Sequence, residues 1–145
     1  MNSPDIARSL KSLTSVQEVE QLKKLEALVK ELNDLVLTPE LYQAIFDLYE
    51  KFPEDDGYGL FTSILHRLER CSGYEQFLIQ SMKRKPTYIA IRMIDRIVVG
   101  GFTQIGEVNL LSLVRAAAKN SLASESARVY AQQCVQEWSA SDADA

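Results

Sequence analysis

Hydrophobic residues recur at intervals of three or four along most of the chain, a spacing that aligns them on one face of a helix. The clearest example follows a predicted capping box at Ser15 and Glu18, and its stripe consists of Leu22, Leu25, Val29, Leu32 and Val36. No segment alternates hydrophobic and polar residues as a half-buried strand does. The pattern therefore predicts an all-α protein.

Start and stop signals divide this pattern into seven predicted helices. Thr38 can cap a helix through its hydroxyl group, and Pro39 suits the first helical position. Further helices are expected after Gly57, from Tyr74, from Pro86, from about Ile105 to Lys119, and from Ser121 or Ser124 onward. The residues predicted to face inward on the helices after the first are Leu41, Ile45, Leu48, Tyr49, Phe52, Phe61, Ile64, Leu65, Leu68, Tyr74, Phe77, Leu78, Ser81, Met82, Ile91, Ile94, Ile97, Val98, Ala127, Tyr130, Cys134 and Trp138.

The turns between these helices are short, which favours antiparallel neighbours. The predicted starts at Pro39 and Tyr74 lie one hairpin apart, a spacing compatible with stacked helix pairs. We expect antiparallel hairpins in an irregular, HEAT-like α-solenoid, with a globular helical bundle as the alternative. Residues 1–138 are expected to form a single helical domain, followed by a short polar tail at residues 139–145. Stacked hairpins of this kind usually present their surface to protein partners.

The composition and net charge of the chain limit the classes of molecule that it is expected to bind. The 145 residues suffice for one sizeable core, and 46% hydrophobic and 25% charged residues are typical of a globular protein. The formal net charge of −4 lacks the basic excess with which nucleic-acid-binding proteins neutralise phosphates, and suits a basic protein partner instead. Neither a signal peptide nor a membrane span is recognisable, so we expect a cytoplasmic protein that does not bind membranes.

The sequence offers few groups for catalysis or for cofactor binding. The only histidine, His66, is expected on the outer face of its helix beside Glu69, where a surface residue is favoured over a general base. Cys71 and Cys134 lie far apart and outside any CxxC pair. The segment GGFTQIGEV has phosphate-loop glycine spacing but carries Glu107 where a lysine is needed. We therefore expect no catalytic residue, metal or cofactor, and no enzymatic activity.

Basic residues cluster in the fourth and fifth predicted helices, at Lys83, Arg84, Lys85, Arg92 and Arg96. In a nucleic-acid site, Tyr88 would be the stacking partner for a base. The acidic charge of the whole chain favours a different interpretation, in which these residues form a solvated helix end and a surface charge group. We therefore expect no nucleic-acid partner.

The stretch FPEDDGYG, from Phe52 to Gly59, contains three consecutive carboxylates. It lacks the alternating ligands and the closing glutamate of a calcium-binding EF-hand loop. We interpret it as a turn in which Asp55 or Asp56 caps the next helix, while Gly57 and Gly59 permit a tight entry. Together with acids of the preceding helix, its exposed side chains form a candidate partner-binding surface in which Tyr58 is the expected aromatic anchor. The predicted surface comprises Asp47, Glu50, Glu54, Asp55, Asp56 and Tyr58.

The run FPEDDGYGLFTSILHRLE (Phe52–Glu69), followed by SMKRKPTYIAIRMIDRIVVGG (Ser81–Gly101), resembles a family of helical bacterial immunity proteins. These proteins belong to polymorphic-toxin systems, including contact-dependent growth inhibition. The resemblance covers the middle third of the chain. It implies a small cytosolic protein that neutralises a cognate toxin domain by binding it, without catalysis.

The acidic excess of the chain suits a cationic toxin such as a nuclease. We expect the inhibitor to act as a monomer. The alternative is a HEAT-like adaptor for an endogenous protein, since both functions use the same kind of scaffold.

Overall fold

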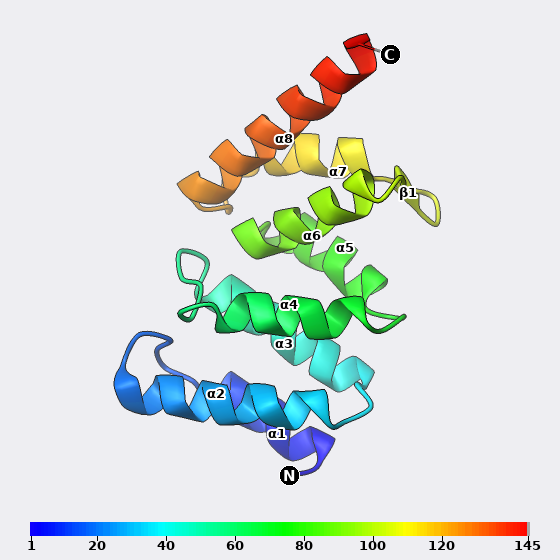
Figure 1. Ribbon diagram of the computed structural model, residues 1–145. Coiled ribbons are helices and arrows are strands. Elements are labelled where there is room, and N and C mark those ends of the chain that lie inside the picture. Colours follow the sequence, from blue (N-terminus) through cyan, green and yellow to red (C-terminus); the bar gives the residue numbers. More distant parts are fainter. Residues whose placement is uncertain (145) are drawn as a thin grey trace. The chain divides into compact units, whose positions relative to one another are not determined.

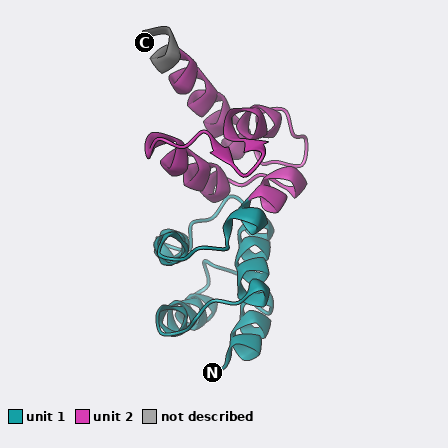
Figure 2. Ribbon diagram, turned by 90° about the vertical axis from the view of Figure 1, so that its right-hand side faces the viewer, with its two compact units in different colours: residues 1–78 teal, residues 79–145 magenta. Residues whose placement is uncertain are grey.

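The computed structural model describes the backbone of residues 1–144 and the side chains of residues 1–139. This part of the chain forms eight α-helices and one two-stranded sheet, which confirms the all-α prediction (Figure 1). The chain divides into two compact units, Met1–Leu78 and Ile79–Ala145, which Figure 2 distinguishes by colour. The single domain and the solenoid arrangement expected for the whole chain stay predictions.

The first unit is built from two helix hairpins whose members pack on one another. Its helices are α1 (Ser3–Lys11), α2 (Val19–Asn33), α3 (Pro39–Lys51) and α4 (Leu60–Glu69). Helix α1 packs on α3 and α2 packs on α4, so each hairpin contributes one helix to each of two layers. As predicted, the hydroxyl oxygen of Thr38 caps α3 by accepting a hydrogen bond from the Leu41 amide at 3.3 Å. The capping box predicted at Ser15 and Glu18 is wrong, because α2 begins only at Val19 and the Ser15 hydroxyl accepts hydrogen bonds from the Gln17 and Glu18 amides ahead of the helix. All four residues predicted to face inward on α4 are buried: Phe61, Ile64, Leu65 and Leu68.

The second unit packs three helices and a small hairpin. Helix α5 (Glu75–Arg84) begins in the first unit and ends in the second, and it is followed by α6 (Tyr88–Val99), β1 (Gln104–Ile105), β2 (Val108–Asn109), α7 (Leu110–Ala117) and α8 (Glu125–Asp144). Helix α8 contacts both α6 and α7. Thr87 caps α6 and Ser124 accepts a hydrogen bond from Ala127 in the first turn of α8, which confirms the second of the two predicted starts.

Helix α8 continues to Asp144 and thus runs through most of the predicted polar tail, residues 139–145. The side chains of residues 140–145 lie outside the described residues. Val36, also predicted to face inward, is 87% exposed, because α2 ends at Asn33 before this position. Several other positions predicted to face inward are only half-buried, namely Leu22, Phe52, Phe77, Ile97, Val98, Tyr130 and Trp138. They lie at the rims of the helix interfaces, where a helical stripe is too wide to be covered completely.

Helix α1 was not among the predicted helices. Its N-cap is Asn2, whose side-chain oxygen accepts a hydrogen bond from the Asp5 amide at 3.0 Å, and a proline lies in its first turn. Nine residues are too few for a helix that is stable alone in water. Packing against α3 supplies the missing stability, because Ile6, Ala7 and Leu10 are fully buried.

The helix predicted from Ile105 to Lys119 is wrong in its first five residues. Residues 104–109 form a β-hairpin in which Gln104 pairs with Asn109 and Ile105 with Val108. Gly106 begins the two-residue turn with a φ of 57°, a conformation that glycine adopts without steric cost. The helix begins only at Leu110, where the Asn109 side chain accepts a hydrogen bond from the Ser112 amide at 2.9 Å.

Within the described residues, none of the helices combines the length and the apolar character needed to cross a bilayer.

Candidate functional site

Two loops of the first unit lie side by side, and the second of them carries four of the six residues of the predicted partner-binding surface. They are residues 12–18, between α1 and α2, and residues 52–59, between α3 and α4. The Gln17 side-chain amide donates a hydrogen bond to the Asp55 carboxylate at 2.5 Å, across 38 positions of sequence. This hydrogen bond joins residues 12–18 to residues 52–59, hereafter the acidic loop. The sequence pattern did not connect these two segments.

The Lys51 ammonium group provides a second link between these loops. It donates hydrogen bonds to the backbone carbonyl oxygens of Leu13 at 2.5 Å and Lys11 at 3.4 Å. Lys51 is the only cation between residues 39 and 59, a stretch that contains six carboxylates. Its charge is thus held against the carbonyl groups that end the α1 segment, and it also lies 5.5 Å from the centre of the Phe52 ring.

The backbone of the acidic loop takes three consecutive left-handed conformations. The φ angles are 58° at Gly57, 53° at Tyr58 and 88° at Gly59, and Tyr58 is the only non-glycine residue with a positive φ among the described residues. An L-residue in this region costs roughly 1 kcal/mol or more relative to ordinary backbone. The Asp56 carboxylate offsets part of this cost by accepting a hydrogen bond from the Tyr58 amide at 2.9 Å.

The predicted helix cap at Asp55 or Asp56 is wrong. Helix α4 begins at Leu60 with Gly59 as its N-cap, and no side chain caps its first turn. The three left-handed residues lie between the carboxylates and the first helical amides, so neither acid reaches those donors. Asp55 instead accepts the hydrogen bond from Gln17, and Asp56 the one from Tyr58.

A rigid aromatic core lies beneath the loop. A Cβ atom on Gly57 would lie 3.3 Å from the Phe61 ring and 3.4 Å from Leu25, so the loop sits directly on these buried side chains. The Phe61 ring packs edge-on against Tyr49 with centroids 5.1 Å apart, and the Tyr49 hydroxyl donates to the Phe61 carbonyl at 3.1 Å. Burial raises the pKa of Tyr49 well above its ordinary value, which keeps its hydroxyl a donor. The loop therefore rests on packed, buried side chains.

The predicted surface residues differ in how they are presented. Glu54, Asp56 and Tyr58 are exposed, and the Tyr58 side chain is 75% exposed. Asp55 and Glu50 are half-buried. Asp47, also half-buried, accepts a hydrogen bond from the Gln43 side chain one turn earlier in α3, which directs it away from the loop. The structure thus brings five of the six residues to the end of α3 and its loop, with Asp47 at the edge.

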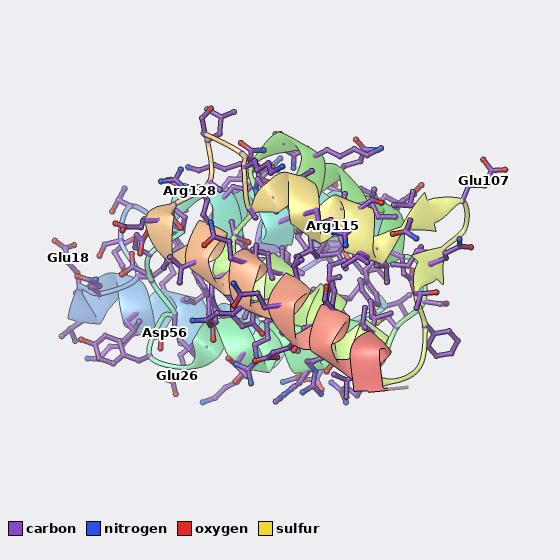
Figure 3. The ribbon with its side chains drawn as sticks, turned by 90° about the horizontal axis from the view of Figure 1, so that it is seen from above. Glu18, Glu26, Asp56, Glu107, Arg115 and Arg128 are labelled. Atoms are coloured by element: carbon purple, nitrogen blue, oxygen red, sulfur yellow. The ribbon has the colours of Figure 1, made fainter. Side chains whose placement is uncertain are left out.

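Glu18 is a further carboxylate at this end of the unit that sequence reasoning missed. It is exposed and adjoins Gln17, whose hydrogen bond to Asp55 brings its segment to the acidic loop; Figure 3 labels Glu18 and Asp56. No local signal links the two loops, because they meet only when α1 and α3 pack. Hereafter the acidic surface means Glu18, Glu50, Glu54, Asp55, Asp56 and Tyr58.

Charge is distributed unequally along the chain. Residues 1–78 contain eight Lys and Arg residues against fourteen Asp and Glu residues, a formal net charge of −6, whereas residues 79–145 contain eight against six, a net charge of +2. The excess of negative charge therefore belongs to the unit that carries the acidic surface. A field of this sign raises the rate at which cationic molecules reach the surface.

Groups with possible chemical roles are few in the part of the chain that the structure describes. His66 is exposed on α4, and no cluster of three or more His, Cys, Asp and Glu side chains could hold a metal ion among the described residues. Burial raises the pKa of the buried Cys134 thiol to about 11, so it is protonated at neutral pH and is not a nucleophile there.

Asp95 connects α6 to α8. Its carboxylate accepts hydrogen bonds from the Trp138 indole at 3.0 Å and from the Tyr130 hydroxyl at 3.5 Å. The Tyr130 ring also packs against Tyr88, with centroids 4.6 Å apart. The rings stack on each other instead of enclosing a space, which makes this group a packing contact between helices and not a ligand cage.

Comparisons with known proteins add no further constraint. No family model, no curated protein and no solved structure matches the chain. The acidic surface is therefore the structural observation from which a function can be inferred.

Proposed function

We propose that this chain is an immunity protein, which binds a cognate bacterial toxin domain and neutralises it by stoichiometric association in the cytoplasm. The observation that carries the proposal is the acidic surface, where Lys51, the only cation in residues 39–59, is held against backbone carbonyls. The partner that fits it is a basic domain, such as a nuclease. The resemblance of residues 52–69 and 81–101 to helical immunity proteins points to the same class of partner.

Binding would begin with electrostatic attraction and end with contact at Tyr58. Exposed carboxylates at the rim of an interface mainly accelerate association, and salt screens this effect. The Tyr58 ring adds a large contact area with a polar tip, and it has few torsions to fix. Because the loop is already ordered on the Phe61 ring, little conformational entropy is lost on binding.

The direct test is co-expression and co-purification with the product of the gene immediately upstream, followed by an assay of that product's toxicity. We expect a one-to-one complex in which toxicity is lost. A toxin that neither binds the protein nor loses activity in its presence would refute the proposal. A stable complex with an endogenous protein instead would favour the adaptor function.

Charge reversal tests the surface itself. We expect the triple variant Glu54→Lys, Asp55→Lys and Asp56→Lys to associate at least about tenfold more slowly at low salt, and less so at high salt. The matched control reverses three exposed acids of the second unit, Glu107, Glu125 and Glu137, and thus changes the net charge equally. Equal slowing in both variants would show that net charge acts, and not this surface.

A further inference from the structure

Helices α7 and α8 of the second unit border an open cleft of about 330 Å³. Arg115, Ala118 and Lys119 line it from the end of α7 and the following turn. Gln132, Val135 and Gln136 line it from α8. Figure 3 labels Arg115 on α7, beside α8. The volume lies at the lower end of the range for small-molecule sites, which begins at roughly 300 Å³.

The two cations of the cleft have no acidic counterpart in the described structure. Arg115 and Lys119 are exposed, and neither charged group forms an ion pair or hydrogen bond with another described residue. Both line the same cleft, Arg115 from the last turn of α7 and Lys119 from the turn that follows it, so their like charges repel. Cations do stabilise the C-terminal end of a helix such as α7, but that effect does not require an adjoining cleft. An anion between them would remove the repulsion.

The remaining surface of the cleft is mostly apolar. Val135 and Ala118 are half-buried, and the aliphatic stems of Arg115 and Lys119 extend this surface toward the charged groups. Gln132 and Gln136 lie one helical turn apart and offer amide donors and acceptors on the same side. An apolar wall with a few convergent polar groups is the usual composition of a ligand site.

We propose that this cleft binds a small organic anion, with a carboxylate or phosphate group held by Arg115 and Lys119 and a compact apolar body against Val135. The charge complementarity excludes a cationic ligand, and the volume excludes a dinucleotide-sized one. The site uses none of the residues of the acidic surface and does not depend on the proposed function.

The test is a titration of the isotope-labelled full chain followed by amide NMR, with 3-phenylpropionate as the probe. We expect saturable shifts concentrated in residues 115–119 and 132–136. The neutral amide of the same acid supplies the apolar body without the charge, and inorganic phosphate supplies charge without the apolar body. Each should bind at least about tenfold more weakly than the probe.

Variants locate the site. The double variant Arg115→Gln, Lys119→Gln should weaken binding of 3-phenylpropionate about tenfold or more, whereas Lys83→Gln, an exposed cation elsewhere in the second unit, should leave it unchanged. Unchanged affinity in the double variant, shifts centred elsewhere, or no saturation would overturn the proposal. Equal binding of the neutral amide would overturn the role of the cations. Sedimentation of the same samples tests whether a second copy of the chain occupies the cleft instead. A self-association that the double variant abolishes would assign the cleft to that second copy.

Discussion

Arg67 holds the C-terminal end of α2 against α4, and its removal gives the sharpest test of how the first unit is stabilised. Its guanidinium group donates to the carbonyl oxygens of Leu32 at 2.8 Å and Leu35 at 2.5 Å, and it also contacts the Cys71 sulfur at 2.8 Å. The last carbonyl groups of a helix have no partner within the helix. Arg67 satisfies one of them, that of Leu32, from another element, and it also satisfies the carbonyl group of Leu35 in the turn after α2.

We expect Arg67→Met to lower the free energy of unfolding by about 2–4 kcal/mol. A hydrogen bond from a charged donor contributes about 1.5–3 kcal/mol, and the half-buried position of Arg67 reduces the sum of two. Methionine retains much of the apolar stem, so the loss reports the hydrogen bonds and not the packing. Arg67→Lys should lie between, at about 1–2 kcal/mol, because an ammonium group cannot span both carbonyls in a fork.

Urea denaturation followed by circular dichroism would measure these losses. Arg70→Met is the matched control, because Arg70 is exposed and donates only to the Asn33 side chain, so its loss should stay below about 0.5 kcal/mol. The Arg67 effect should also change little with added salt, since both acceptors are backbone carbonyls. Equal losses in the two methionine variants, or a loss that salt removes, would refute the capping role.

Three further outcomes follow from residues described above. Tyr58→Gly should raise the free energy of unfolding by about 0.5–1 kcal/mol, because glycine adopts the left-handed backbone without steric cost. The same variant should slow or weaken partner binding. A lower free energy of unfolding would contradict the inference that the backbone is strained at Tyr58. Leu65→Ala should lower stability by about 2–5 kcal/mol in the same urea assay, because the side chain is fully buried, and a loss under about 1 kcal/mol would misplace the core. Burial holds the pKa of Cys134 at about 11 against an ordinary 9.0, so the unfolded thiol ionises first and stability should fall as the pH rises above about 9. Under reducing conditions, Cys134→Ala should flatten this pH slope while Cys71→Ala retains it, and an unchanged slope in Cys134→Ala would refute the assignment.

Features that depend on neighbouring residues were predictable from the sequence. The stripe of α4 and the Thr38 cap of α3 are local patterns, and both match the structure. Helix α1 was missed because nine residues form a helix only when α3 covers them. The hairpin at residues 104–109 was missed because its strands are two residues long, too short to show alternation.

The candidate site was predictable only in part, because some of its contacts join residues that lie far apart in the sequence. The carboxylates and Tyr58 stand together in the sequence and could be recognised as a group. Their backbone conformation could not be predicted. The three left-handed residues delay the start of α4 to Leu60, so neither Asp55 nor Asp56 caps this helix. The hydrogen bonds of Gln17 and Lys51 join positions 38 or more residues apart, and a single sequence holds no periodic signal for such pairs.

The hydrogen bonds of Lys51 link the segment at the end of α1 to the charge of the acidic surface, although α1 contributes no residue to that surface. The carbonyl groups of Lys11 and Leu13 hold the ammonium group, so proteolytic removal of this segment would release a positive charge at the end of α3 that leads into residues 52–59. Trimming the N-terminal segment would therefore change the charge around a loop forty residues away along the chain. Side-chain replacement at position 11 would not, because the acceptor there is backbone that every residue type supplies. During evolution, the exposed Lys11 can therefore vary in chemistry while the charge arrangement of the acidic surface is inherited intact.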